Sequence, residues 1–258
     1  GLSMIHHMLV HPAIRYLFAR QDVLMLHAGA VCHNDQSILL TGPGGTGKTT
    51  TTSLLLSQAG VDYALHADDY VFINQSFSLS YMTRSHLYHD ILNWVPEMSS
   101  RLTAIEKIRL RIFGLLRKWS AEGIKWPTRI SANRLWPTKT LCNRGKIMGL
   151  IYLSRGKTDH QPRLTQLVEV DQITNEILDM NFSEARHFIK LLEKDHSLDD
   201  LSSWLEEWRR IEYGLLKRLL DTVPLYQLRL PHRSDFSRGY VDRVLGEIDR
   251  ITTNASPS

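Results

Sequence analysis

The chain has 258 residues, of which 43% are hydrophobic and 22% are charged. These values are ordinary for a globular protein, and the length suits one large α/β domain or one domain with an insertion. The formal net charge of +4 fits an anionic substrate but is too small to indicate nucleic-acid binding.

The cysteines and the apolar segments exclude further classes of protein. Cys32 and Cys142 have no paired spacing, so we expect neither a disulfide nor a thiolate metal site. No apolar run reaches the length of a membrane span, and no signal peptide is visible. We therefore expect a cytoplasmic protein with no membrane and no nucleic-acid partner.

The N-terminal segment predicts helices and then a strand. Apolar positions at helical spacing across residues 5–20, interrupted by Pro12, predict one or two short helices. Packing or surface positions explain its histidines better than a metal does. These histidines are His6, His7 and His11.

Residues 23–32 predict one apolar strand, and Asn34-Asp35-Gln36 predicts a hairpin turn into the next strand, residues 37–41. This arrangement would place His27 at the start of a strand that lies beside strand 37–41. A single histidine in a strand is usually structural.

Strand 37–41 is followed by Gly42-Pro43-Gly44-Gly45-Thr46-Gly47-Lys48-Thr49, the phosphate-binding pattern G-x-x-x-x-G-K-T. Glycines let successive backbone N–H groups point at phosphate oxygens. Lys48 can reach the β- and γ-phosphates, and the Thr49 hydroxyl can hold Mg²⁺. A helix over residues 50–60, ended by Gly60, would aim its positive dipole end at the same phosphates. The expected ATP-binding residues are Gly42, Gly44, Gly45, Thr46, Gly47, Lys48, Thr49 and Thr50.

Residues 61–66 predict a strand that delivers Asp68 and Asp69 at its carboxyl end, where ligand sites lie in open α/β sheets. Two adjacent carboxylates there can also be a turn or a helix cap. Beside a phosphate-binding loop they have a chemical use. One can hold Mg²⁺, and the other can accept the proton of an attacking hydroxyl.

Three blocks in this order carry a resemblance to a known family: Leu26-His27-Ala28-Gly29-Ala30-Val31, the glycine-rich loop, and Ala67-Asp68-Asp69. Together they resemble the catalytic domain of HPr kinase/phosphorylase, whose relatives include small serine kinases and the precursor-peptide kinases of lasso-peptide clusters. The resemblance covers residues 23–73.

The resemblance implies a P-loop core of the HPr kinase/phosphoenolpyruvate carboxykinase type, with a mixed β-sheet flanked by helices. It implies that Asp69 is the catalytic base with His27 close to it, and that Asp68 lies nearer the metal. It also implies that the chain can form an oligomer of identical subunits. The signature with which HPr kinases engage HPr is not recognisable, so we do not expect HPr as the substrate.

A helical insertion is expected around residues 82–135, after a short strand at residues 77–80. Residues 99–122 predict an amphipathic basic helix. That helix could bind an acidic partner or cover the active site, but we favour packing on the domain with its arginines in solvent.

Residues 146–155 predict a central strand, with residues 164–170 as its partner strand. A cation near these strands could balance the transferring phosphoryl group, although each candidate is more simply a surface residue. The candidates are Arg144, Arg155 and Arg163.

The C-terminal third predicts helices and one more strand. Ser183 is expected to cap a helix over residues 184–193. A long helix over 198–223, a strand over 225–230 and a helix over 236–251 follow. We expect one domain over residues 1–251 and a disordered tail over 252–258.

These features favour a kinase that transfers the γ-phosphate of ATP, with Mg²⁺, to a hydroxyl. The acceptor would be a serine of a peptide or protein, including a natural-product precursor peptide, or a small-molecule alcohol. The alternative is a nucleotide-binding or nucleotide-hydrolysing regulatory protein without phosphotransfer. A carboxykinase-like reaction is disfavoured because the chain is short for one and shows no substrate-binding arginine motif.

Overall fold

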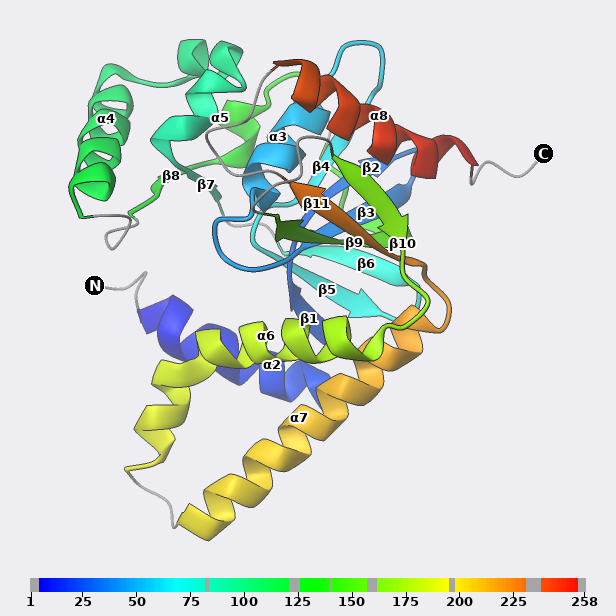
Figure 1. The fold of residues 1–258 in the computed structure, drawn as a ribbon. Helices are drawn as coiled ribbons and strands as arrows, with labels where there is room; N and C mark the ends of the chain where they lie inside the picture. Colours follow the sequence, from blue (N-terminus) through cyan, green and yellow to red (C-terminus); the bar gives the residue numbers. More distant parts are fainter. Residues whose placement is uncertain are drawn as a thin grey trace.

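The computed structural model describes residues 5–81, 84–120, 126–139, 141–156, 162–194, 198–230 and 238–254. It is an α/β structure in which a mixed β-sheet is flanked by helices on both faces (Figure 1). Within these ranges, no helix combines the length and the apolar character needed to cross a membrane.

Nine strands form the main sheet, in the order β1-β5-β6-β9-β3-β2-β4, and β11 joins β9 while β10 pairs with β11. The strands are β1 (Leu24–His27), β2 (Gly29–His33), β3 (Gln36–Thr41), β4 (Ala64–Ala67), β5 (Tyr70–Asn74), β6 (Phe77–Tyr81), β9 (Arg144–Arg155), β10 (Arg163–Gln166) and β11 (Leu225–Leu230). The long strand β9 is central: it runs parallel to β3 and β11 and antiparallel to β6. A separate two-stranded sheet pairs β7 (Ser85–Leu87) with β8 (Thr128–Ile130).

Helices cover both faces of the main sheet, and others lie in a lobe beside it. Within the described residues the helices are the π-helix η1 (His6–Val10), α2 (His11–Ala19), α3 (Lys48–Ser57), the 3₁₀-helices η2 (His89–Asn93) and η3 (Pro96–Arg101), α4 (Ala104–Trp119), α5 (Ala132–Leu135), α6 (Asp171–Leu192), α7 (Leu198–Leu220) and α8 (Arg238–Asn254). In Figure 1, α3 and α8 lie above the sheet, and α2, α6 and α7 lie below it.

The two helical layers bury two separate apolar cores, because successive residues of a strand point to opposite faces of the sheet. On β9, Ile151 and Leu153 pack in the core that contains α3 and α8. Leu150 and Tyr152 pack in the core that contains α6 and α7. The middle of β9 is therefore a continuous apolar run, as expected for a strand covered by helices on both faces of the sheet.

Several predicted elements are confirmed with small changes of boundary. Pro12 lies in the first turn of α2, where its missing N–H is harmless, and η1 precedes it. Asn34 and Asp35 form the two-residue hairpin turn between β2 and β3, with φ values of 50° and 58°. The predicted central strand and the last strand are β9 and β11.

The predicted strand 23–32 is wrong in its continuity. The chain breaks at Ala28 into β1, which pairs with β5, and β2, which pairs with β3 and β4. His27 therefore ends β1, which pairs with β5, and does not begin a strand paired with β3. It still lies next to the end of β3, because the Thr41 hydroxyl donates to the His27 carbonyl oxygen at 3.1 Å. The predicted partner of β9 at residues 164–170 is also wrong, since β10 pairs with β11.

Helix α6 differs from its prediction. It runs without interruption over Asp171–Leu192, so Ser183 lies inside the helix and caps nothing. The Ser183 hydroxyl instead donates a hydrogen bond to the Met180 carbonyl oxygen, at 2.7 Å. At the other end of the chain, residues 252–254 of the predicted tail belong to α8, and residues 255–258 lie outside the described ranges.

The expected insertion forms a lobe at the upper left of Figure 1, from η2, η3, α4, α5 and the β7–β8 sheet. Its main helix, α4, is shorter than the predicted 99–122. As expected, α4 packs on the domain and keeps arginines in solvent, since Leu110 belongs to the core that contains α3 and α8. Leu110 is, however, its one buried residue, and most of its apolar side chains face outward.

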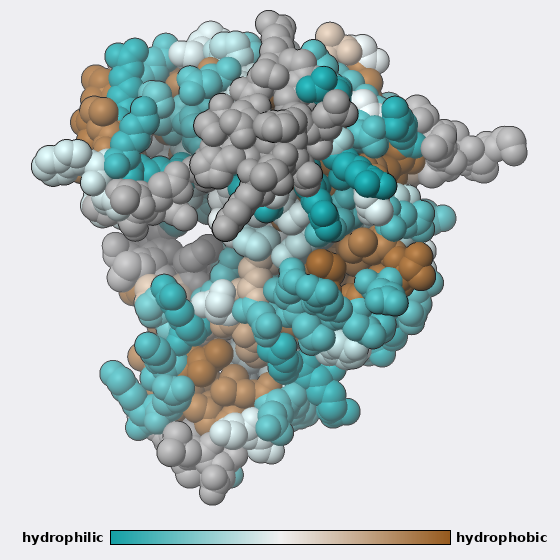
Figure 2. Space-filling view, viewed as in Figure 1, coloured by the Kyte–Doolittle hydropathy of each residue, from teal (hydrophilic) through white to brown (hydrophobic). Residues whose placement is uncertain are grey.

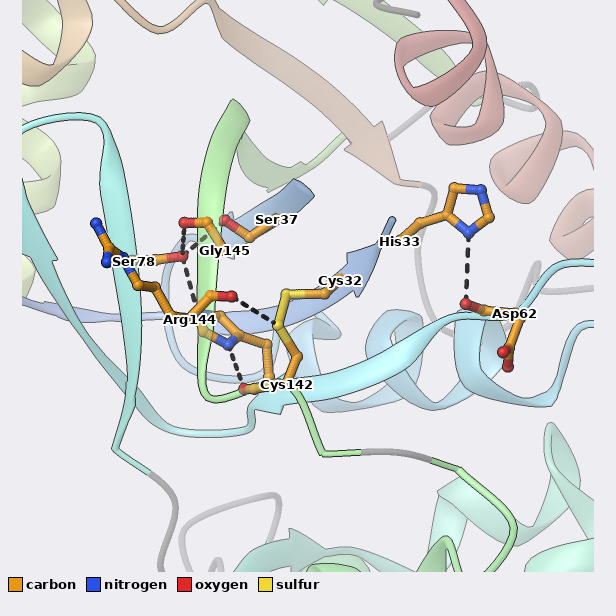
Figure 3. Close-up of a disulfide and its surroundings, with 9 residues drawn as sticks. Cys32, His33, Ser37, Asp62, Ser78, Cys142, Arg144 and Gly145 are labelled. Atoms are coloured by element: carbon orange, nitrogen blue, oxygen red, sulfur yellow. Dashed lines mark hydrogen bonds between the residues drawn. A yellow bond between two sulfur atoms is a disulfide. The ribbon is translucent and has the colours of Figure 1, made fainter. Parts of the chain in front are cut away.

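A disulfide joins Cys32 on β2 to Cys142 just before β9, contrary to the sequence expectation (Figure 3). The two cysteines are 110 positions apart, and the sheet brings them together. A possible metal-ligand set is also here, because His66 and the two sulfurs lie within 4.8 Å of one another. However, His66 Nδ1 is 2.7 Å from the Cys142 carbonyl oxygen and Nε2 is 2.8 Å from Ser78 Oγ. With both ring nitrogens hydrogen-bonded and both sulfurs joined, the group reads as structural.

Candidate active site

The glycine-rich loop connects β3 to α3 and has the backbone shape that its glycines permit. Gly42, Gly45 and Gly47 have φ values of 141°, 85° and 111°, a region that favours glycine. At Gly42 the chain also passes close to β9, since a Cβ atom there would lie 2.4 Å from the Leu153 carbonyl oxygen. Gly47 directly precedes the first turn of α3. The loop therefore ends at a helix N-terminus, where backbone N–H groups and the helix dipole favour an anion.

Lys48 is the first residue of α3, and its side chain is buried beneath the loop. Its Nζ donates a hydrogen bond to the Gly42 carbonyl oxygen at 2.6 Å. Burial lowers the pKa of Lys48, while the charges of Glu184, Asp69 and Asp68 act to raise it. The ammonium group is thus placed between the loop and three carboxylates from other parts of the chain.

Thr49, in the first turn of α3, lies beside Asp68, which directly follows β4. Its hydroxyl acts to lower the pKa of the Asp68 carboxyl group. Burial raises the pKa of Asp68 to about 7, assisted by the nearby charge of Asp69 and opposed by hydrogen bonds from His86 and Thr49. Asp68 is therefore a carboxylate that a nearby cation would stabilise in its ionised form.

Two neighbouring strand breaks bring His27 and Asp69 together. One break, at Ala28, separates β1 from β2, and the other, at Asp68-Asp69, separates β4 from β5. The breaks face each other, because the Ala28 N–H donates to the Asp69 carbonyl oxygen at 3.0 Å. As a result, His27 Nε2 lies 3.3 Å from Asp69 Oδ1.

Glu184 on α6 completes this group from the other side of the imidazole. Its Oε1 is in direct contact with His27 Nδ1, and the Tyr70 hydroxyl donates to its Oε2 at 2.8 Å. Burial acts to raise the pKa of Glu184, but His27 and the Tyr70 hydroxyl together hold it below its usual value. An ionised Glu184 can fix the orientation of the His27 ring, which in turn faces Asp69.

His86, on β7 of the inserted lobe, contacts both aspartates. Its backbone N–H donates to Asp68 Oδ2 at 2.8 Å, and its Nδ1 lies 3.5 Å from Asp69 Oδ2. The inserted lobe thus supplies part of the site and does not merely sit beside it.

One of the three candidate arginines lies at the glycine-rich loop. Arg155, at the end of β9, donates from Nε to the Gly45 carbonyl oxygen at 3.2 Å and from Nη2 to the Thr46 carbonyl oxygen at 3.4 Å. Arg144 lies over the Phe77 ring at the other end of β9, and Arg163 is exposed on β10. Only Arg155 of this set is placed to meet a group bound at the loop.

The structure brings most of the predicted site residues to one place. His27, Lys48, Thr49, Asp68 and Asp69 interact directly or through their charges. Among the remaining loop residues, Gly44 and Gly45 are exposed, Thr46 is buried with its hydroxyl donating to the Pro43 carbonyl oxygen at 2.8 Å, and Thr50 is half-buried in the first turn of α3.

Sequence reasoning missed Glu184, Tyr70 and His86 as site residues. Glu184 was placed in the first turn of a helix, and neither Tyr70 nor His86 belongs to a recognisable pattern. Tyr70 directly follows Asp69, so its place in the chain was the one available signal.

Comparisons with known proteins add a distant likeness in fold. No family model matches the sequence, and no curated protein matches it. Among solved structures, the chain is similar to the Hpr(Ser) kinase/phosphatase from Coxiella burnetii, with 9% identity and a TM-score of 0.39 over 89% of this chain and 92% of that chain.

Proposed function

We propose that this protein is an ATP- and Mg²⁺-dependent kinase that transfers the γ-phosphate to a hydroxyl group. The observation that carries the proposal is the pairing of Asp69 with His27, 3.3 Å apart, on the same side as Lys48 and the glycine-rich loop. A protein that only binds a nucleotide has no use for a carboxylate base oriented in this way.

The residues present fit the two ligands that this reaction needs. A helix N-terminus, glycine-rich backbone and the Lys48 ammonium match a polyphosphate. The hydroxyl oxygen of Thr49 and the carboxylate of Asp68 are hard oxygen donors, which Mg²⁺ prefers. When bound there, the metal would neutralise charge on the β- and γ-phosphates.

In this proposal, Asp69 accepts the proton of the acceptor hydroxyl. The hydroxyl oxygen forms a bond to the γ-phosphorus as the bond to the β–γ bridging oxygen breaks, and ADP leaves. His27 and Glu184 hold Asp69 in position, while Lys48 and Arg155 stabilise negative charge on the phosphates.

The acceptor we favour is a serine of a peptide or protein, with a natural-product precursor peptide as the specific candidate and a small-molecule alcohol as the other. This choice rests on the resemblance of the three sequence blocks to HPr kinase relatives. The same resemblance underlies our proposal that the sheet and loop form a P-loop core of the HPr kinase/phosphoenolpyruvate carboxykinase type.

Transfer from γ-labelled ATP with Mg²⁺ tests the proposal. The acceptors are the peptides and proteins encoded beside this gene and a panel of hydroxyl compounds that includes serine. We expect label on one acceptor, loss of transfer and weakened nucleotide binding in Lys48→Ala, and a loss of 10²-fold or more in Asp69→Asn with nucleotide binding kept. Tight ATP binding with slow hydrolysis and no labelled acceptor would instead identify a regulatory nucleotide-binding protein.

A further inference from the structure

Helix α4 carries a row of apolar side chains on the outside of the inserted lobe. Their exposed fractions run from 48% at Ile112 to 93% at Trp119. The row consists of Ile105, Ile108, Ile112, Leu115 and Trp119, and we call it the α4 stripe. Figure 2 shows hydrophobic side chains at the upper left edge of the molecule, where α4 lies in Figure 1. Single exposed apolar residues need no explanation, but a contiguous row does.

Contacts on the opposite side of α4 hold the stripe outward. Leu110 is buried, Gly114 packs so closely on His89 that a Cβ atom would lie 2.9 Å from it, and Arg117 forms an ion pair with Asp90 at 3.6 Å. At 100° per residue, positions 110, 114 and 117 share one side of the helix, and the stripe is centred on the other. A capping box between Thr103 and Glu106 stabilises the N-terminus of the helix.

The stripe has the spacing of a helix-pairing seam. Its members follow one another at intervals of three, four, three and four residues, which is the a/d spacing of a heptad repeat. Because the seam is narrow and regular, it suits the side chains of one other helix better than the broad contact that a helix makes when it lies on a membrane surface.

The charges beside the stripe select the kind of helix. Arg109, Arg111 and Lys118 are exposed next to it, and none of them forms a hydrogen bond or ion pair with the described residues. Glu106, the only acidic residue of α4, serves the cap and an ion pair with Arg134. A second copy of α4 would therefore bring cations and no free carboxylates to the seam.

We propose that the α4 stripe is a docking site for an acidic amphipathic helix of another polypeptide. The partner would have apolar residues at a/d spacing and Glu or Asp beside them. The stripe covers residues 105–119, so the docked helix would have about four turns, roughly 22 Å. The proposal does not depend on the kinase reaction, because it rests on α4 alone.

A designed peptide provides the test. The probe is a fluorescent 18-residue helix with Leu at a and d and Glu at the flanking positions, and its control has Lys in place of Glu. Anisotropy with the full chain should give micromolar binding of the acidic probe, weakening as salt rises, and at least tenfold weaker binding of the basic control.

Substitutions on exposed side chains make the test specific. Leu115→Asp should reduce affinity for the acidic probe at least tenfold, while Val168→Asp, at a site 93% exposed outside α4, should leave it unchanged. Failure of the acidic probe to bind at 100 μM, or equal binding of the acidic and basic probes, would overturn the proposal.

Two other occupants of the stripe would also overturn it. One is a membrane, shown by binding to vesicles containing phosphatidylserine without binding of the probe. The other is a second copy of the chain, shown by self-association that is lost in Leu115→Asp, again without binding of the probe.

Discussion

The buried carboxylate Asp68 gives the most quantitative prediction. Burial raises its pKa from the usual 3.8 to about 7, and one pKa unit corresponds to about 1.4 kcal/mol. A carboxyl group whose pKa is higher in the folded state favours folding while it is protonated, and that advantage is lost as pH rises from about 4 to about 7. Above pH 7, ionised Asp68 therefore costs the folded protein about 4 kcal/mol.

Asp68→Asn removes this cost while keeping an oxygen that can accept from the His86 N–H. Asparagine is neutral at every pH, so the variant should be more stable than the wild type, and by more at higher pH. Integrating between the two pKa values gives a free-energy difference that widens by roughly 2–3 kcal/mol from pH 5 to pH 8. This is a relative increase in melting temperature of about 5–10 °C for a chain of this size.

Thermal unfolding without Mg²⁺ or nucleotide, at pH 5 and pH 8, measures the effect. Asp62→Asn is the matched control, because the Asp62 side chain is 90% exposed and its ion pair with Lys139, at 3.2 Å, lies at the surface, where such pairs contribute little to stability. Parallel pH profiles for wild type and Asp68→Asn would refute the reasoning. With Mg²⁺ and ATP at pH 8 the order should reverse, because the cation uses the charge that the variant lacks.

Three further predictions concern single contacts. Glu184→Gln should slow transfer roughly tenfold or more with little change in ATP affinity, because the neutral amide no longer pairs with the His27 ring. The control is Glu176→Gln on the same helix: Glu176 accepts from the Tyr152 hydroxyl of β9 as Glu184 accepts from Tyr70, and its replacement should leave the rate unchanged. Equal effects in steady-state kinetics would count against a role for Glu184. Cys32→Ser should lower the free energy of unfolding by about 4–5 kcal/mol, because the disulfide closes a long loop. Denaturant unfolding measures this, and an unchanged midpoint denaturant concentration would show that the disulfide does not stabilise the protein. Arg155→Ala should weaken ATP binding measured by calorimetry, and an unchanged affinity would remove it from the phosphate site.

The parts of the site that could be predicted from the sequence are mainly those whose residues lie next to one another in the chain. The loop needs glycines, Lys48 and Thr49 in one short run, and Asp68 and Asp69 are adjacent. In the same way, β9 and β11 were predictable because their apolar patterns are local.

Periodicity leaves other questions open. It shows that α4 is amphipathic but not which side faces the domain, and the apolar side faces out. Ser183 looks like a helix cap, yet the apolar pattern of α6 begins earlier, at Ile173, and carries the helix through it. The disulfide between Cys32 and Cys142 could not be predicted from the sequence. The two cysteines are brought together only when the whole sheet places β2 next to the start of β9.

The position of Glu184 illustrates how the rest of the chain builds the site. It reaches His27 from 157 positions away, so its place depends on how α6 packs under the sheet. Arg15 on α2 fixes that packing: it donates to the Asn181 carbonyl oxygen, one turn before Glu184, and to Glu212 on α7, each at 2.6 Å. Because the Arg15–Glu212 pair is buried, breaking it would leave an unpaired charge in the core. The helical layer below the sheet therefore orients the His27 ring, and through it Asp69, by way of Glu184. The glycine-rich loop and the two aspartates can be recognised in the sequence, but the packing that brings Glu184 to them cannot.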